Sequence, residues 1–161
     1  MEMLQREDGA ESHAIGTWRN LVLSLWRVTP TVEQVEKLRR AVNTALARHP
    51  KGMGLVVIAQ LPASPPAEDA RKSFIALTEE AQSGMKAAAV VAEGKGFGAA
   101  VVRSVTTGVV LLARSRVPTR VFAESPEASA WLSDELGRAH AGCGSATELE
   151  AAIQALRAIR S

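Results

Sequence analysis

The chain has 161 residues, a single cysteine and a formal net charge of +2. This length suits one domain. Leu, Ile, Val and Phe together supply 39 residues, enough apolar material for a core, which argues against a disordered chain. Because Cys143 is the only cysteine, the chain cannot form an internal disulfide or a zinc site that needs two of its own thiolates.

The charge and hydropathy pattern predicts a cytoplasmic protein. The first ten residues are polar and charged, unlike the apolar centre of a signal peptide. The longest apolar stretch, Val101 to Ala113, contains Arg103 and several polar residues and is shorter than the roughly 20 residues of a membrane span. Acidic residues are interspersed with basic ones, so we expect neither a transmembrane segment nor a nucleic-acid partner.

The first elements in chain order are predicted to form a hairpin. Residues 1–11 are expected to be a flexible tail. A short strand is predicted at Ser12 to Thr17, and alternating apolar residues predict a second strand from Asn20 to Val28. An amphipathic helix is predicted from Val32 to Arg48, with Thr31 as its N-cap and Gln34 as the capping-box partner.

The middle of the chain alternates between apolar strands and helices. The run from Gly54 to Leu61 is typical of a strand covered on both faces. A helix follows the proline-rich loop 62–66, with Ser64 as its expected cap. A short strand is predicted at Ala87 to Val91, and a helix that is apolar on nearly every side is predicted from Phe97 to Ala113.

The last part of the chain predicts one more strand and two helices. The strand covers Thr119 to Phe122, and the segment Ser125-Pro126-Glu127 has the residues of a helix start, with Ser125 as the cap. Residues 137–144 are expected to be a linker. Ser145 and Glu148 form a second capping-box pattern, which predicts a C-terminal amphipathic helix that docks on the domain or meets another chain.

This order predicts an α/β fold. We expect a mixed sheet of about five strands with helices packed on it, plus an extra C-terminal helix. The expected organisation is a tail at 1–11, a domain at 12–136, and a linker with a helix at 137–161.

Two segments resemble a known family. They are the glycine-rich helix start at 96–104 and the final unit formed by Arg120 to Glu124 with Ala130-Trp131-Leu132. Together with the order of elements from Ser12 to Leu136, they resemble SpoIIAA-like, or STAS-like, proteins, which include anti-anti-sigma factors and small proteins grouped as STAS/SEC14 domains. The resemblance implies this fold and a regulatory role.

One departure limits what the resemblance implies. Anti-anti-sigma factors carry an Asp-Ser-Ser/Thr-Gly type segment after the central strand, and its hydroxyl is phosphorylated. The matching segment here is Pro62-Ala63-Ser64-Pro65-Pro66. The phosphorylation switch is therefore not carried over, and Ser64 keeps its interpretation as a helix cap.

Two groups of residues are candidates for binding. The glycine-rich turn before the helix expected at 97–113 could contact an anion or a small ligand, and its alternative role is to allow close packing; the candidates are Lys95, Gly96, Phe97, Gly98 and Arg103. Basic and aromatic residues form a candidate interaction surface, because tryptophan is enriched where proteins bind; these are Trp18, Trp26, Arg114 and Arg116.

No catalytic, metal-binding or cofactor-binding residue is predicted. The three histidines, at 13, 49 and 140, do not have metal-ligand spacing, and Cys143 lies in the expected linker without a partner motif. We therefore expect a non-enzymatic regulatory or protein-interaction module whose partner is another protein or a second copy in a homodimer. The alternative is a protein that binds a small apolar or anionic, lipid-like ligand.

Overall fold

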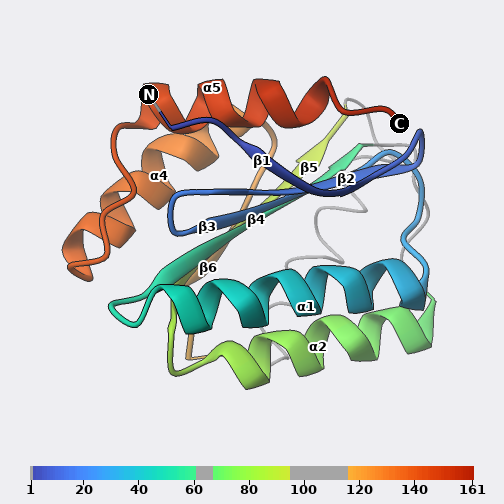
Figure 1. The fold of residues 1–161 in the computed structure, drawn as a ribbon, viewed down its shortest axis with the longest axis horizontal. Helices are drawn as coiled ribbons and strands as arrows, with labels where there is room; N and C mark the ends of the chain where they lie inside the picture. The colour runs from blue at the N-terminus through green and yellow to red at the C-terminus, as the bar shows by residue number, and fades with distance from the viewer. Residues whose placement is uncertain (1, 61–66, 95–115) are drawn as a thin grey trace.

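The computed structural model describes residues 2–60, 67–94 and 116–161 (Figure 1). In these ranges a mixed sheet of six strands lies between two pairs of helices, which confirms the α/β class. In chain order the elements are β1 (Gln5–Gly9), β2 (His13–Trp18), β3 (Leu21–Trp26), α1 (Val32–Arg48), β4 (Met53–Gln60), α2 (Glu68–Ala81), β5 (Met85–Glu93), β6 (Thr119–Phe122), α4 (Ser125–Arg138) and α5 (Ala146–Arg157).

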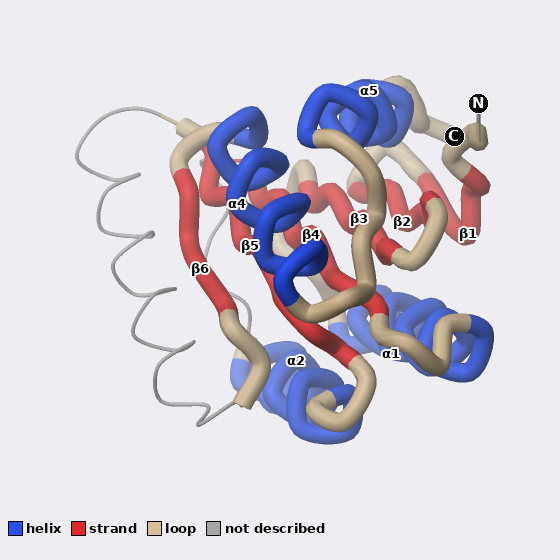
Figure 2. The backbone as a smooth tube through the Cα atoms, turned by 90° about the vertical axis from the view of Figure 1, so that its left-hand side faces the viewer, coloured by secondary structure: helices blue, strands red, loops and turns tan. Residues whose placement is uncertain are grey.

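The strands lie in the sheet in the same order as in the chain. The pairs β1–β2 and β2–β3 are antiparallel, and each later pair from β3 to β6 is parallel. Helices α1 and α2 cover one face of the sheet, and α4 and α5 cover the other (Figure 2). Successive parallel connections with one handedness place their helices on the same face, as α1 and α2 are.

The structure confirms the bounds of several predicted elements and the capping boxes predicted for two helices. The helix at Val32–Arg48 has the predicted bounds, and Thr31 and Gln34 form both hydrogen bonds of the capping box. Ser145 and Glu148 form the second capping box, at the start of α5. The predicted strand at Thr119–Phe122 also has its expected bounds.

The expectation of a flexible tail at residues 1–11 is wrong for Gln5–Gly9, which form β1 at the edge of the sheet. This strand contains no large apolar residue, so no alternation of apolar and polar residues marks it in the sequence. Backbone pairing with β2 holds it there, together with side-chain contacts to residues of that strand. The described part of the chain therefore contributes six strands to the sheet, instead of about five.

At the C-terminal end one expectation is wrong and one of two alternatives is observed. Glu124, and not Ser125, is the N-cap of α4, because the Ser125 hydroxyl lies in the first turn and donates to the Glu150 carboxylate of α5 at 2.7 Å. Helix α5 docks within the same chain: Leu149, Ile153 and Leu156 are fully buried in the core that α4 shares with the sheet.

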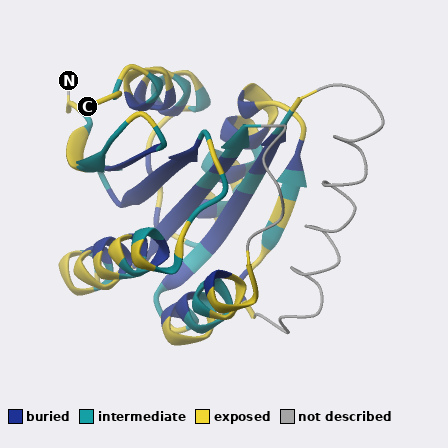
Figure 3. Cartoon of the chain, turned by 90° about the vertical axis from the view of Figure 1, so that its right-hand side faces the viewer, coloured by how far each residue is buried: buried dark blue, intermediate teal, exposed yellow. Residues whose placement is uncertain are grey.

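The core has two parts, one on each face of the sheet. Buried residues line the inner sides of the helices and nearly the whole length of the central strands, while the outer sides of the helices are exposed (Figure 3). Gly54 on β4 allows α4 to approach the sheet, since a Cβ atom there would lie 3.1 Å from Cδ1 of Leu136 and 2.7 Å from Cδ2 of Leu21.

Some expectations concern residues outside the described ranges. One of them is the helix expected at Phe97 to Ala113. The expectation that Ser64 caps the helix after the proline-rich loop is wrong, because that helix, α2, begins at Glu68 and its N-cap is Ala67. No helix in the described ranges combines the length and the apolar composition that crossing a bilayer requires.

Candidate functional site

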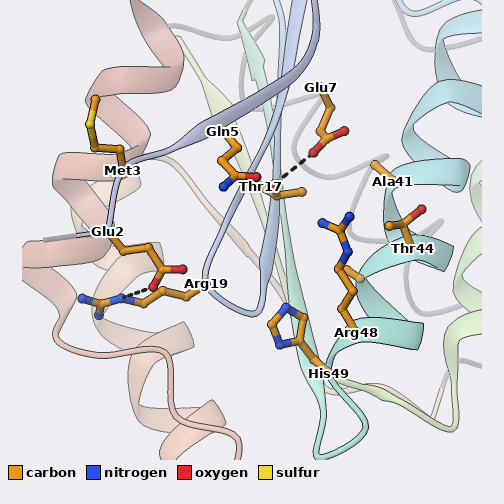
Figure 4. A pocket seen from close by; sticks show the side chains of 11 residues that line it. Glu2, Met3, Gln5, Glu7, Thr17, Arg19, Ala41, Thr44, Arg48 and His49 are labelled. Carbon is orange, nitrogen blue, oxygen red and sulfur yellow. Dashed lines mark hydrogen bonds and ion pairs between the residues drawn. The ribbon is translucent and has the colours of Figure 1, made fainter.

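A hollow of about 220 Å³ lies between the N-terminal strands and the second half of α1 (Figure 4). Residues on or next to the first two strands line one side, and residues of α1 and its C-cap line the other. They are Glu2, Met3, Gln5, Glu7, Thr17 and Arg19, and Ala41, Thr44, Ala45, Arg48 and His49. We call this hollow the β1–α1 groove. It lies where the edge of the sheet meets the helix that covers it.

The wall formed by β1 is acidic. The register between β1 and β2 shifts between Arg6 and Asp8, so Glu7 is the extra residue of a bulge. The Glu7 side chain is exposed, and its carboxylate accepts a hydrogen bond from the Thr17 hydroxyl at 3.1 Å (Figure 4). This contact fixes a negative charge on the groove wall.

The wall formed by α1 is apolar at its base and basic at its end. Ala41, Thr44, Ala45 and Arg48 follow the spacing that places residues on one side of a helix. The two alanines are buried, whereas Thr44 and Arg48 are exposed. Arg48 lies in the last turn, where a positive charge interacts favourably with the helix dipole.

Arg48 has no ionic partner in the part of the chain that the structure describes. Among the residues that the structure describes, its guanidinium makes no hydrogen bond or ion pair. Its side chain extends from the end of α1 toward the strand that carries Glu7 (Figure 4). A guanidinium has five N–H donors, so Arg48 is available to a carboxylate or another anion.

Outside the groove lining, ionic contacts join β1 to α1. The Lys37 ammonium lies 3.3 Å from Oδ2 of Asp8, and Nε2 of His13 lies 2.6 Å from the same oxygen. Burial alone would raise the pKa of Asp8, but the hydrogen bonds from His13 and Lys37 outweigh it and hold that pKa below its usual value. These contacts fasten β1 to the body of the protein.

His13 is held on all sides. Its ring is stacked on Trp26 with centroids 5.6 Å apart, and its Nδ1 lies 2.9 Å from the Ser12 hydroxyl. Ser12, His13 and Asp8 are hydrogen-bonded in the order of a hydrolase triad. However, His13 is only 4% exposed and Asp8 also binds Lys37, so the arrangement does not present a histidine base to a substrate. These contacts give His13 a structural role: it lies on β2 and contacts Asp8 of β1 and Trp26 of β3.

Arg19 also lines the groove and contacts three other parts of the chain. Its Nη2 lies 2.5 Å from Oε2 of Glu148, its Nη1 donates to the Cys143 carbonyl at 2.7 Å, and its Nε lies 3.6 Å from the Glu2 carboxylate. The guanidinium also lies over the Trp18 ring, 4.4 Å from its centroid. The hydrogen bond from Arg19 is the main cause that lowers the pKa of Glu148, with Ser145 adding to it.

The described members of the predicted interaction surface, Trp18, Trp26 and Arg116, do not form one surface. Trp18 is 4% exposed and Trp26 is 1% exposed, each in a different part of the core, so neither indole offers a surface to a partner. They are buried because they lie on the paired strands β2 and β3, which helices cover from both faces. Arg116 is exposed and lies away from the groove lining.

The other candidate residues lie outside the described ranges. These are Lys95, Gly96, Phe97, Gly98, Arg103 and Arg114.

Sequence reasoning missed the groove. Met3 and Glu7 fall in the segment that was expected to be a tail, and Arg48 is an ordinary polar residue of an amphipathic pattern. The available signal was the pair of alanines at 41 and 45 beside polar residues at 44 and 48. Side chains this small leave space along that side of the helix.

Across residues 2–60, 67–94 and 116–161, no three His, Cys, Asp or Glu side chains lie together as a metal site would require. Comparisons with protein-family models, with curated proteins and with solved structures gave no match.

Proposed function

We propose that the chain is a non-enzymatic regulatory or protein-interaction module that binds a partner protein at the β1–α1 groove. The observation that carries this proposal is Met3, a groove residue whose exposed fraction is 81%. In the described part of the chain, Val28 is the other large apolar residue that is exposed. An exposed apolar residue that shares a groove lining with charged groups such as Glu7 and Arg48 is typical of a protein interface.

The size of the groove favours a protein partner over a small ligand. Pockets for small molecules have volumes of about 300–1,000 Å³, whereas the groove has about 220 Å³. That volume suits one or two inserted side chains. A small apolar or anionic ligand was expected at the glycine-rich turn near Lys95 and Arg103, which lies outside the described residues.

We also propose that the fold is SpoIIAA/STAS-like. The residues Arg120 to Glu124 and Ala130-Trp131-Leu132 support this proposal, since they lie in β6, the turn after it and α4, as the last unit of such proteins would require. The parallel strands β3 to β6, with α1 and α2 on one face, agree with the expected order of elements.

Site-specific photocrosslinking tests the proposed function. Benzoylphenylalanine would replace Met3 in one variant and Arg138 in the control, because Arg138 is exposed on α4, on the other face of the sheet. We expect protein adducts from position 3 in cells, a large reduction of these adducts by the added substitution Arg48→Glu, and background labelling at position 138. Equal labelling at the two positions would contradict the proposal.

A further inference from the structure

The two walls of the groove carry opposite charges that do not meet. Outside the groove lining, β1 and α1 pair directly through Asp8 and Lys37 at 3.3 Å. Within the lining, Glu7 accepts a hydrogen bond from Thr17 but has no ionic partner among the described residues. Arg48 likewise has none there. As far as the described residues show, the groove lining therefore presents an anion and a cation without ionic partners, on opposite walls.

Building on the function proposed above, we propose that the occupant of the groove is a second copy of this chain. In a twofold interface, a residue on one copy contacts a residue on the other, and the reciprocal contact follows by symmetry. Glu7 of each copy would pair with Arg48 of the other, so two ion pairs form from one acidic and one basic wall. A groove with both charges is thus complementary to itself.

The exposed apolar residue of the groove fits the same arrangement. Met3 lies in the groove lining with Glu7 and Arg48, and it is the large apolar side chain that would be covered when two copies meet. Methionine adapts its shape to irregular surfaces, which suits a contact between two identical side chains. Burial of Met3 would add apolar free energy to the two ion pairs.

Pairing of the two β1 edges is disfavoured, so the contact uses side chains. Arg6 donates from Nη2 to the Gly9 carbonyl at 3.0 Å and thereby occupies part of the strand's outer edge. The bulge at Glu7 further interrupts the edge. Bulges and charged side chains are the features by which edge strands avoid pairing with another chain.

A charge-swap experiment tests the second copy directly. Glu7→Arg places two arginines at each contact, and Arg48→Glu places two glutamates there, so each variant alone repels itself. In a mixed dimer both contacts join an arginine to a glutamate. We expect a dimeric wild type, at least a tenfold weaker association of each variant, and recovery of a dimer with one copy of each in the equimolar mixture. Sedimentation equilibrium gives the affinities, and native mass spectrometry gives the composition of the dimer.

The matched control is Lys51→Glu, a charge reversal at an exposed residue outside the groove lining, which should leave the dimer unchanged. Thermal melting checks that the variants fold. A monomeric wild type, or a mixture of folded variants that stays monomeric, would overturn the inference. If Met3 still crosslinks to a different protein in that case, the proposed interaction function survives; if it crosslinks to none, both proposals fail.

Discussion

Nη2 of Arg19 lies 2.5 Å from Oε2 of Glu148 and joins the turn between β2 and β3 to the first turn of α5. Because this contact lowers the pKa of Glu148 below its ordinary value of 4.5, the folded state gains stability from the ionised carboxylate. That gain is present above the unfolded-state pKa and is lost as the pH falls through the folded-state pKa.

Glu148→Gln should therefore flatten the dependence of stability on pH. We expect the free energy of unfolding of the variant to fall less than that of the wild type as the pH drops from neutral to below 4.5. Urea denaturation at a series of pH values measures this slope. Glu127→Gln on α4 is the matched control. A variant slope identical to that of the wild type would contradict the role given to Arg19.

Two glycines should respond to alanine in opposite directions. A Cβ atom at Gly54 would lie 2.7 Å from Leu21 and 3.1 Å from Leu136, so Gly54→Ala should destabilise the fold by about 1–3 kcal/mol. A Cβ atom at Gly137 meets nothing within 4 Å, so Gly137→Ala in α4 should stabilise it by about 0.5–1 kcal/mol. Urea denaturation measures both, and destabilisation by both variants would show that α4 packs differently.

Helix α1 and strand β1 differ in how far the sequence alone could predict them. Helix α1 and the capping boxes at Thr31 and Ser145 depend on neighbouring residues, so they could be predicted from local patterns. Strand β1 depends on pairing with β2 and on the contact between Asp8 and His13, which no local pattern reveals. The groove combines β1 with a helix that begins 23 residues after that strand ends, so it could not be predicted while β1 was missing.

The single thiol should react slowly in the folded protein. Cys143 is 2% exposed, and burial raises the pKa of its thiol, so little thiolate is present at pH 8. We expect Ellman's reagent to react more than about tenfold faster with the unfolded chain in guanidinium chloride than with the native protein. Cys143→Ala should abolish the signal. Equal rates in the native and unfolded states would show that residues 139–144 open readily.

Asn20 holds together three segments that are distant in the sequence. Its Nδ2 donates to the Ala141 carbonyl at 2.7 Å and to the Gly52 carbonyl at 3.2 Å, at a buried position. Asn20→Ala leaves both carbonyl oxygens without this donor and should destabilise the fold by about 1–3 kcal/mol. Asn43→Ala, at an exposed position inside α1, should not destabilise the fold, because alanine has the higher helix propensity, by up to about 0.7 kcal/mol.

Asn20→Asp distinguishes the loss of a donor from the loss of volume, because the two side chains have nearly the same size. An ionised carboxylate cannot donate to the carbonyl oxygens of Gly52 and Ala141, and it adds a negative charge beside them. At neutral pH the aspartate variant should therefore be less stable than the alanine variant. Protonation restores one donor, so the difference should narrow as the pH falls toward 4. Urea denaturation at both pH values measures the two differences, and an aspartate variant as stable as the wild type at neutral pH would show that these hydrogen bonds do not hold the segments together.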